Sequence, residues 1–179
     1  QTYKLSTMSR LITLALLKAD VAAMPHKINQ VNHILRQNNL RILARKKFTP
    51  NPTTNQMIDN FYSEHEGKFF HRRLVEYMKS GPFEAVVLGA ENESDDAIQK
   101  WRELIGGARI YQKGELAEDD SILPELRTLH GISDTRNGFH GSDAPETAKT
   151  EMSKLGFNYR QILSEHKENL DFNREFLYI

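Results

Sequence analysis

The longest apolar run of this sequence is Leu11 to Leu17, and it constrains the fold more than any other stretch. The run is far shorter than the roughly 20 residues of a membrane-spanning helix, so we expect no membrane span. A short run that is apolar on both faces is typical of a central, buried strand. The run ends at Lys18-Ala19-Asp20, so polar groups begin where the predicted strand stops.

Length and charge exclude several classes of protein. A chain of 179 residues fits one domain with a sizeable core. Its 24 Lys and Arg side chains balance 24 Asp and Glu side chains, so no overall field attracts nucleic acid or an anionic membrane. The first 80 residues are basic and the rest acidic, which suits either an anionic ligand bound from one side or solvated faces that neutralise each other. The absence of cysteine excludes disulfides, thiolate zinc sites and a cysteine nucleophile.

Hydrophobic periodicity predicts alternating strands and helices. The predicted strands after the first are 40–45, with one drier face, and 83–88. The predicted helices are 25–38, ended by Asn38-Asn39, a pair between residues 53 and 80 that is capped by Thr53 or Thr54, and one that Asp95-Asp96 opens and Gly106-Gly107 ends. This order predicts an α+β sandwich, an open sheet covered by helices.

The same sequence patterns divide the chain into three parts. We expect residues 1–10 to be an N-terminal extension, residues 11–155 to form the domain, and residues 156–179 to be a tail whose apolar side chains either pack on the domain or form a partner surface. Residues 109–126 show no hydrophobic periodicity, which predicts a long connection with a short turn at Leu123-Pro124.

One stretch carries the chemistry, Arg136-Asn137-Gly138-Phe139-His140-Gly141-Ser142-Asp143. Glycine on both sides of Phe139-His140 allows a tight backbone turn that leaves the imidazole exposed. Asp143 and Glu146 have the spacing of a capping box, which predicts that a helix begins directly after His140. A helix N-terminus favours an anion such as phosphate. Glu151 lies two turns into that helix, and its carboxylate could hold one ring nitrogen and leave the other free to attack. For a lone histidine, a surface turn is the commoner explanation.

At these residues the sequence resembles the nucleoside diphosphate kinase family, whose active-site motif is Asn-x-x-His-Gly-Ser-Asp. The stretch 137–143 matches every specified position, and the similarity extends from about Leu11 to Glu151. It is similar to the divergent second group of the family, near the nucleoside diphosphate kinase 6 branch. Further matching segments are 13–20, Phe61-Tyr62-Ser63-Glu64-His65, Ser80-Gly81-Pro82, Trp101-Arg102 and Asp134-Thr135-Arg136-Asn137.

The resemblance implies a ferredoxin-like βαββαβ antiparallel sheet and ping-pong transfer of the γ-phosphate of a nucleoside triphosphate to a nucleoside diphosphate. It implies that His140 is the nucleophile, that Glu151 orients it through a hydrogen bond, and that Ser142 supports them. The nucleotide-binding residues that it implies are Lys18, Tyr62, Phe70 (stacked on the base), Arg102, Arg127 and Asn137. Phosphoryl transfer depends mainly on positioning and on cations, which agrees with these residue types. Magnesium would arrive on the nucleotide phosphates and need no protein site of its own.

Two departures from the family pattern leave an alternative open. The usual Gly-Pro-Thr is Gly106-Gly107-Ala108, so a phosphate-binding hydroxyl is missing at Ala108. The connection from Ala108 to Arg127 is longer than usual and acidic. The alternative is a weakly active or inactive kinase-like module that acts through protein partners. A nucleic-acid-binding module is the third hypothesis, supported by Arg41 to Lys47 and opposed by net neutrality.

The remaining expectations concern assembly, metal and compartment. The family's closed oligomers predict self-association. The spacing of His65, His71 and the neighbouring acids fits no known metal-ligand pattern, so we interpret them as structural or solvated. We expect a mitochondrial or cytoplasmic location, with the mitochondrion suggested by the family branch. The basic N-terminal residues 1–10 resemble the end of a cleaved targeting segment, and a trimmed terminus explains them equally well.

Overall fold

The predicted α+β sandwich is confirmed by a computed structural model, which describes residues 10–110 and 125–176, with side chains described to residue 171. Within these residues four strands form one antiparallel sheet in the order β2-β3-β1-β4. This is the ferredoxin-like order that the resemblance implied. The strands are β1 (Ile12–Leu17), β2 (Leu40–Phe48), β3 (Phe83–Ala90) and β4 (Phe139–Gly141).

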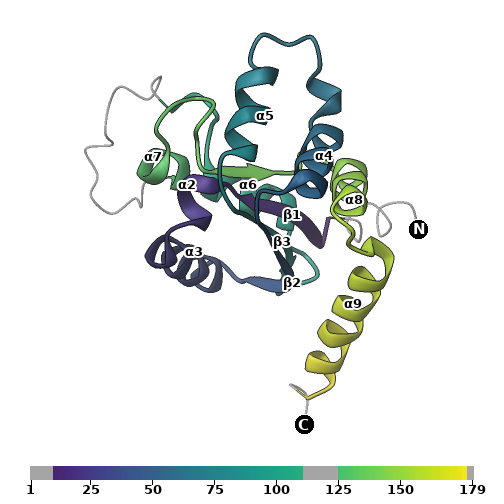
Figure 1. Cartoon of the computed structure of the whole chain (residues 1–179). Coiled ribbons are helices and arrows are strands. Elements are labelled where there is room, and N and C mark those ends of the chain that lie inside the picture. Colours follow the sequence, from purple (N-terminus) through teal and green to yellow (C-terminus); the bar gives the residue numbers. More distant parts are fainter. Residues whose placement is uncertain (1–9, 111–124, 177–179) are drawn as a thin grey trace.

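Helices cover the sheet and extend beyond it. The hairpin of α4 and α5 stands above the sheet in Figure 1, whereas α3 lies below it. No helix in the described part of the chain is long and apolar enough to span a membrane. The helices are α2 (Ala19–Ala22), α3 (Pro25–Gln37), α4 (Pro52–Phe61), the 3₁₀ turn η1 (Ser63–His65), α5 (His71–Lys79), α6 (Ala97–Ile105), α7 (Leu126–His130), α8 (Pro145–Lys154) and α9 (Tyr159–Phe176).

Strand β1 is the centre of the fold, as its sequence predicts. Every residue from Ile12 to Leu17 is buried, because the strand pairs with β3 on one side and β4 on the other while α6 and α8 pack against it. Neighbouring β3 is buried along its whole length. These two strands form the middle of the apolar core, against which side chains of the covering helices pack.

Helix ends follow the sequence in part. Asp96 accepts a hydrogen bond from the backbone N–H of Gln99, and Gly106 ends α6 with a φ of 76°, both as predicted. The cap of α4 is Asn51, which accepts from the N–H of Thr54, so the prediction of a threonine cap was wrong. The predicted capping box was also wrong, because Ala144 is the N-cap of α8 and makes no side-chain cap bond.

The prediction that residues 40–45 have one buried and one exposed face was wrong for most of strand β2. A bulge between Ile42 and Ala44 shifts the register against β3, so the simple alternation is lost after Leu40. Each bulge inserts an unpaired residue and turns the following side chains to the other face. Leu40 is buried, whereas Ile42 is 36% exposed. The predicted turn at Leu123-Pro124 lies outside the described residues.

The described part of the tail forms α9, which packs onto the domain. His166 is buried and its Nε2 lies 2.8 Å from the carbonyl oxygen of Ala90, at the end of β3. Gly89 leaves the space for this ring, since a Cβ there would lie 2.7 Å from His166 Nε2 and 2.7 Å from Leu43 Cδ1. Leu170, one turn further along α9, is buried as well. Helix α9 is therefore held against β3 at Gly89, where the missing side chain leaves room for His166.

We expect Gly89→Ala to destabilise the protein by about 1–2 kcal/mol, because the added methyl group overpacks the contact between β3 and α9. Urea denaturation measures the change in the free energy of unfolding. Gly107→Ala is the matched control, since nothing lies within 4 Å of a Cβ at that exposed position. Equal stability of the two variants would show that His166 does not need the space at Gly89.

Candidate active site

His140 lies on strand β4 and not in the exposed turn that the flanking glycines predicted. It pairs with Leu16 of β1, and its carbonyl oxygen accepts a 2.9 Å hydrogen bond from Trp101 Nε1. Its side chain is 22% exposed, so the imidazole is partly enclosed. Gly138 has a φ of 77°, and a Cβ on Gly141 would lie 2.6 Å from Trp101 Cδ1. Gly138 therefore allows a left-handed turn before β4, and Gly141 allows Trp101 to approach the strand closely.

A buried carboxylate stands behind the histidine ring. Nε2 of His140 is buried and lies 2.9 Å from Oε1 of Glu151, close enough for an ion pair, although the two groups are not aligned as a hydrogen bond. The other carboxylate oxygen of Glu151 accepts a hydrogen bond from the hydroxyl of Ser142, and both residues are buried. Phe61 packs edge-on against the imidazole at 5.5 Å between ring centroids. The ring is therefore held from two sides, with Nδ1 as the nitrogen that Glu151 does not contact.

A cavity of about 580 Å³ opens in front of this ring, which is a typical size for a small-molecule site. Six of the nine sequence-predicted site residues line it, whereas Ser142 and Glu151 lie behind His140 and Arg102 lies elsewhere. The predicted residues on the wall are Lys18, Tyr62, Phe70, Arg127, Asn137 and His140.

Lys18 and Asn137 form a buried pair on the cavity wall. The ammonium group of Lys18 donates a 2.9 Å hydrogen bond to the side-chain oxygen of Asn137. The backbone N–H of Lys18 donates to the carbonyl of Gly138, which ties the end of β1 to the residues before β4. Burial and the nearby Arg127 lower the pKa of Lys18 from its ordinary 10.5 to about 7. The free site therefore opposes the charged form of this amine more than water does.

Arg127 reaches the same cavity from α7. Its guanidinium donates to the carbonyl oxygens of Gly106 at 2.7 Å and Phe139 at 3.0 Å. Its Nε is buried with no partner in the described part of the chain. Burial, together with the nearby charge of Arg102, lowers its pKa to about 10. Arg102 lines a separate hollow with Glu125 and does not reach the cavity wall.

Tyr62 lines the same cavity with a buried phenol side chain. The residue is buried, and within the described residues its hydroxyl has no hydrogen-bond partner. Burial raises its pKa far above the ordinary value, and the carboxylate of Glu151 adds to the shift. A neutral phenol in this position can donate one hydrogen bond to an anionic ligand.

The mouth of the cavity contains residues that sequence reasoning missed. Phe69 is 87% exposed there, and His65, interpreted as structural or solvated, lies on the wall beside Phe70. The pair Phe69-Phe70 is apolar and would ordinarily indicate core, so periodicity carried no signal of an exposed ring. The other wall residues outside the predicted set are Arg73, Leu74, Ala108, Arg109, Ser133, Asp134, Thr135 and Phe139.

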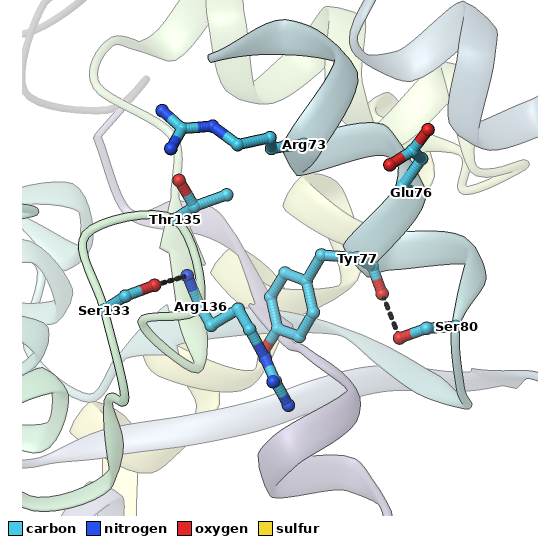
Figure 2. A pocket seen from close by; sticks show the side chains of 7 residues that line it. All are labelled: Arg73, Glu76, Tyr77, Ser80, Ser133, Thr135 and Arg136. Atoms are coloured by element: carbon cyan, nitrogen blue, oxygen red, sulfur yellow. Dashed lines mark hydrogen bonds between the residues drawn. The ribbon is translucent and has the colours of Figure 1, made fainter.

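A second hollow adjoins the mouth, as Figure 2 shows. Arg73 and Thr135 lie at its upper edge and also belong to the cavity wall. The guanidinium of Arg136 lies 5.5 Å from the centre of the Tyr77 ring and is 2.8 Å from Asp20. Because Asp20 neutralises Arg136, the hollow has less free positive charge than the cavity.

No protein-only metal site is visible in the described ranges. Residues 10–110 and 125–176 contain no group of three or more His, Asp or Glu side chains placed to hold a cation. The cavity wall instead gathers cations, among them Lys18 and Arg127. Such a wall suits a ligand that carries several negative charges.

Comparisons with known proteins agree with this geometry. The sequence profile of the family "Nucleoside diphosphate kinase" matches residues 12–162. Nucleoside diphosphate kinase 6 of Xenopus tropicalis is 37% identical over 142 residues, which cover 79% of this chain and 73% of that protein. Nucleoside diphosphate kinase of Actinobacillus pleuropneumoniae is 37% identical over 151 residues, covering 84% and 97% of the two chains.

Solved structures give the same result. The crystal structure of Aquifex aeolicus nucleoside diphosphate kinase has a TM-score of 0.68 and 28% sequence identity, covering 83% of this chain and 95% of that one. The enzyme of Encephalitozoon cuniculi shares the fold at a TM-score of 0.66 and 24% identity, covering 82% and 89%. With this sequence match, this sheet order and a motif histidine backed by Glu151, the chain belongs to the nucleoside diphosphate kinase family, as a member similar to nucleoside diphosphate kinase 6.

Proposed function

We propose that this nucleoside diphosphate kinase works through a phosphohistidine at His140. The observation that carries the proposal is the position of the ring, with Glu151 2.9 Å from Nε2 and the cavity in front of it. The lone pair of Nδ1 attacks the γ-phosphorus, the bond to the bridging oxygen breaks, and the nucleoside diphosphate leaves with that electron pair. A terminal phosphate oxygen of a second nucleoside diphosphate then attacks the phosphohistidine and regenerates the free ring.

Glu151 and Ser142 support this step from behind. Attack through Nδ1 places positive charge on the ring, and the buried carboxylate 2.9 Å from Nε2 stabilises that charge. The hydroxyl of Ser142 donates to the far oxygen of Glu151, so the carboxylate keeps its position. Both are positioning groups for His140 in this mechanism.

The cations of the wall stabilise the transferring phosphoryl group. The transition state is loose, with its charge spread over oxygens, so fixed cations and donors lower its energy. Lys18 and Arg127 face the cavity, and the unpartnered hydroxyl of Tyr62 adds a neutral donor. In this structure the guanidinium of Arg102 lies 3.5 Å from the carbonyl oxygen of Gly141 and outside the cavity wall. Arg102 would therefore need a side-chain movement to contact the phosphates.

We also propose that Mg²⁺ comes with the nucleotide. The wall fits this arrangement, since the cations of Lys18 and Arg127 favour phosphates and the carboxylate of Glu151 lies behind His140. Magnesium keeps several waters and needs few protein ligands when phosphates bind it. When bound, it would neutralise part of the phosphate charge. Self-association and a mitochondrial or cytoplasmic location remain proposals that rest on the family.

A weaker enzyme, or a module that acts through partners, is the second candidate. Ala108 favours it, because this residue lies on the cavity wall with a methyl group where the family has a threonine hydroxyl. One lost hydrogen bond to a charged phosphate costs about 1–3 kcal/mol of transition-state stabilisation. The acidic stretch that first suggested this alternative falls largely on residues 111–124, outside the described residues.

The phosphohistidine has a direct test. Incubation with γ-labelled ATP should give an acid-labile phosphoprotein that ADP or GDP discharges, and His140→Ala should abolish the label because the nucleophile is gone. His33→Ala, which removes an exposed histidine of α3, is the control and should label normally. Labelling of the His140→Ala protein would remove His140 from the mechanism.

The missing hydroxyl at Ala108 predicts a gain of activity. Ala108→Thr should raise kcat/KM about tenfold or more by restoring a donor to the phosphates. Ala108→Val has the same shape without the hydroxyl and should leave kcat/KM near the original value. A coupled assay of nucleoside triphosphate formation measures both variants. An equal effect of threonine and valine would assign the change to packing and not to the hydroxyl.

The lowered pKa of Lys18 predicts a pH dependence of nucleotide affinity. The free site loses the Lys18 proton near pH 7, whereas bound phosphate restores the charge, so binding takes up a proton at higher pH. ADP affinity should therefore fall by up to about tenfold per pH unit between pH 7.5 and 9, where the phosphates themselves keep a nearly constant charge.

Calorimetry in buffers of different ionisation enthalpy measures this proton uptake. Lys18→Met should weaken ADP binding and abolish the uptake. Lys47→Met, which removes an exposed lysine of β2, should preserve both. Proton uptake that survives in Lys18→Met would assign it to another group.

A further inference from the structure

The two ends of the cavity differ in chemistry. The end at His140 has buried polar residues, among them Lys18 and Asn137. The mouth has the aromatic rings of Phe69, which is exposed, and Phe70. On the proposed function the phosphates occupy the first end, so the base at the opposite end of the nucleotide reaches the mouth, where a flat ring can stack on an aromatic side chain.

Asp134 contributes a carboxylate to the wall of the same cavity. Its Oδ1 accepts a 3.1 Å hydrogen bond from the backbone N–H of Ile110, and its backbone carbonyl accepts a 3.0 Å bond from the side-chain amide of Asn137. The same loop is closed by a bond from the Arg136 N–H to the Ser133 hydroxyl, drawn in Figure 2. The carboxylate is thus held on the wall, close in the chain to the residue that binds Lys18.

Among the described residues, only one carboxylate oxygen of Asp134 accepts a hydrogen bond. Within the described residues Oδ2 makes no hydrogen bond, and the carboxylate forms no ion pair. An ionised carboxylate is an acceptor without any donor. A base that places N–H groups against it is therefore favoured, and one that places a ring-nitrogen lone pair against it is repelled.

Guanine and adenine differ at this point. Guanine carries two neighbouring donors, N1–H and the 2-amino group, whereas adenine has an acceptor at N1 and no 2-amino group. Arg73, at the same mouth, packs at 5.7 Å on the ring of Phe69 and has no hydrogen bond or ion pair within the described residues. Its guanidinium suits the O6 acceptor of guanine and opposes the 6-amino donor of adenine.

We infer that Asp134 makes this site select guanine over adenine nucleotides. The inference rests on the proposed function for the direction in which the nucleotide lies. Selection by paired hydrogen bonds is stronger than selection by shape, because the wrong base leaves polar groups unpaired. Asp134 is exposed, so water competes for its oxygens and the effect is smaller than at a buried site.

Equilibrium binding of GDP, IDP and ADP with Mg²⁺ tests the inference, because IDP keeps the N1–H and O6 of guanine and lacks the 2-amino group. Wild-type protein should bind GDP about tenfold more tightly than ADP, with IDP between them. Asp134→Asn should reduce or reverse the preference, since asparagine pairs with adenine. The isosteric amide keeps an oxygen for the Ile110 N–H, so the loop should remain in place.

Asp171→Asn, which neutralises an exposed carboxylate on α9, should keep the wild-type order of affinities. Equal affinities for GDP and ADP, an unchanged preference in Asp134→Asn, or no GDP binding at all would overturn the inference. Binding needs no phosphoryl transfer, so the phosphohistidine at His140 and the base selection by Asp134 can each fail without the other. Loss of labelling with the GDP preference intact would overturn the phosphohistidine, and normal labelling with equal affinities would overturn the role of Asp134.

Discussion

The short pairing of β4 with β1 is the constraint on which the site depends. Three residue pairs join the strands, and the middle pair places His140 of the edge strand β4 beside Leu16 of the buried strand β1. Trp101 of α6 then binds the carbonyl of His140, and it fits there because Gly141 has no side chain. A side chain on the edge of a rigid core loses little freedom when a ligand binds, which suits the nucleophilic role proposed for His140.

The same burial that positions the site makes its charges costly. Burial is the main cause that lowers the pKa of Lys18 and of Arg127, while repulsion from Arg127 adds to the shift of Lys18 and repulsion from Arg102 adds to that of Arg127. Polyanionic phosphate relieves this repulsion. Burial therefore opposes positive charge in the free site, and a bound polyanion would favour the charged forms of both side chains.

Local sequence patterns predicted the elements well because their causes are local. The apolar run 11–17, the helix start at Asp96 and the end at Gly106 depend on neighbouring residues. Two helix caps were wrong although caps are local, and the other errors came from choices that the rest of the fold decides. The bulge in β2 depends on pairing with β3, and His140 became a strand residue because β1 offered it a free edge. The family motif supplied most of the predicted site, and exposed Phe69 lacked any local signal.

The sequence by itself determined strands β1 to β3, helices α3 to α6 and α8, and the identity of the motif histidine with its carboxylate partner. The tertiary structure alone decided which side chains share the cavity. It brought Lys18 beside Asn137, 119 residues apart in the chain, and Asp134 to the same wall as Phe70, while it left Arg102 outside. The reason is physical. Periodicity records which face of an element avoids water, whereas cavities form where several elements meet and burial sets the charge of each group.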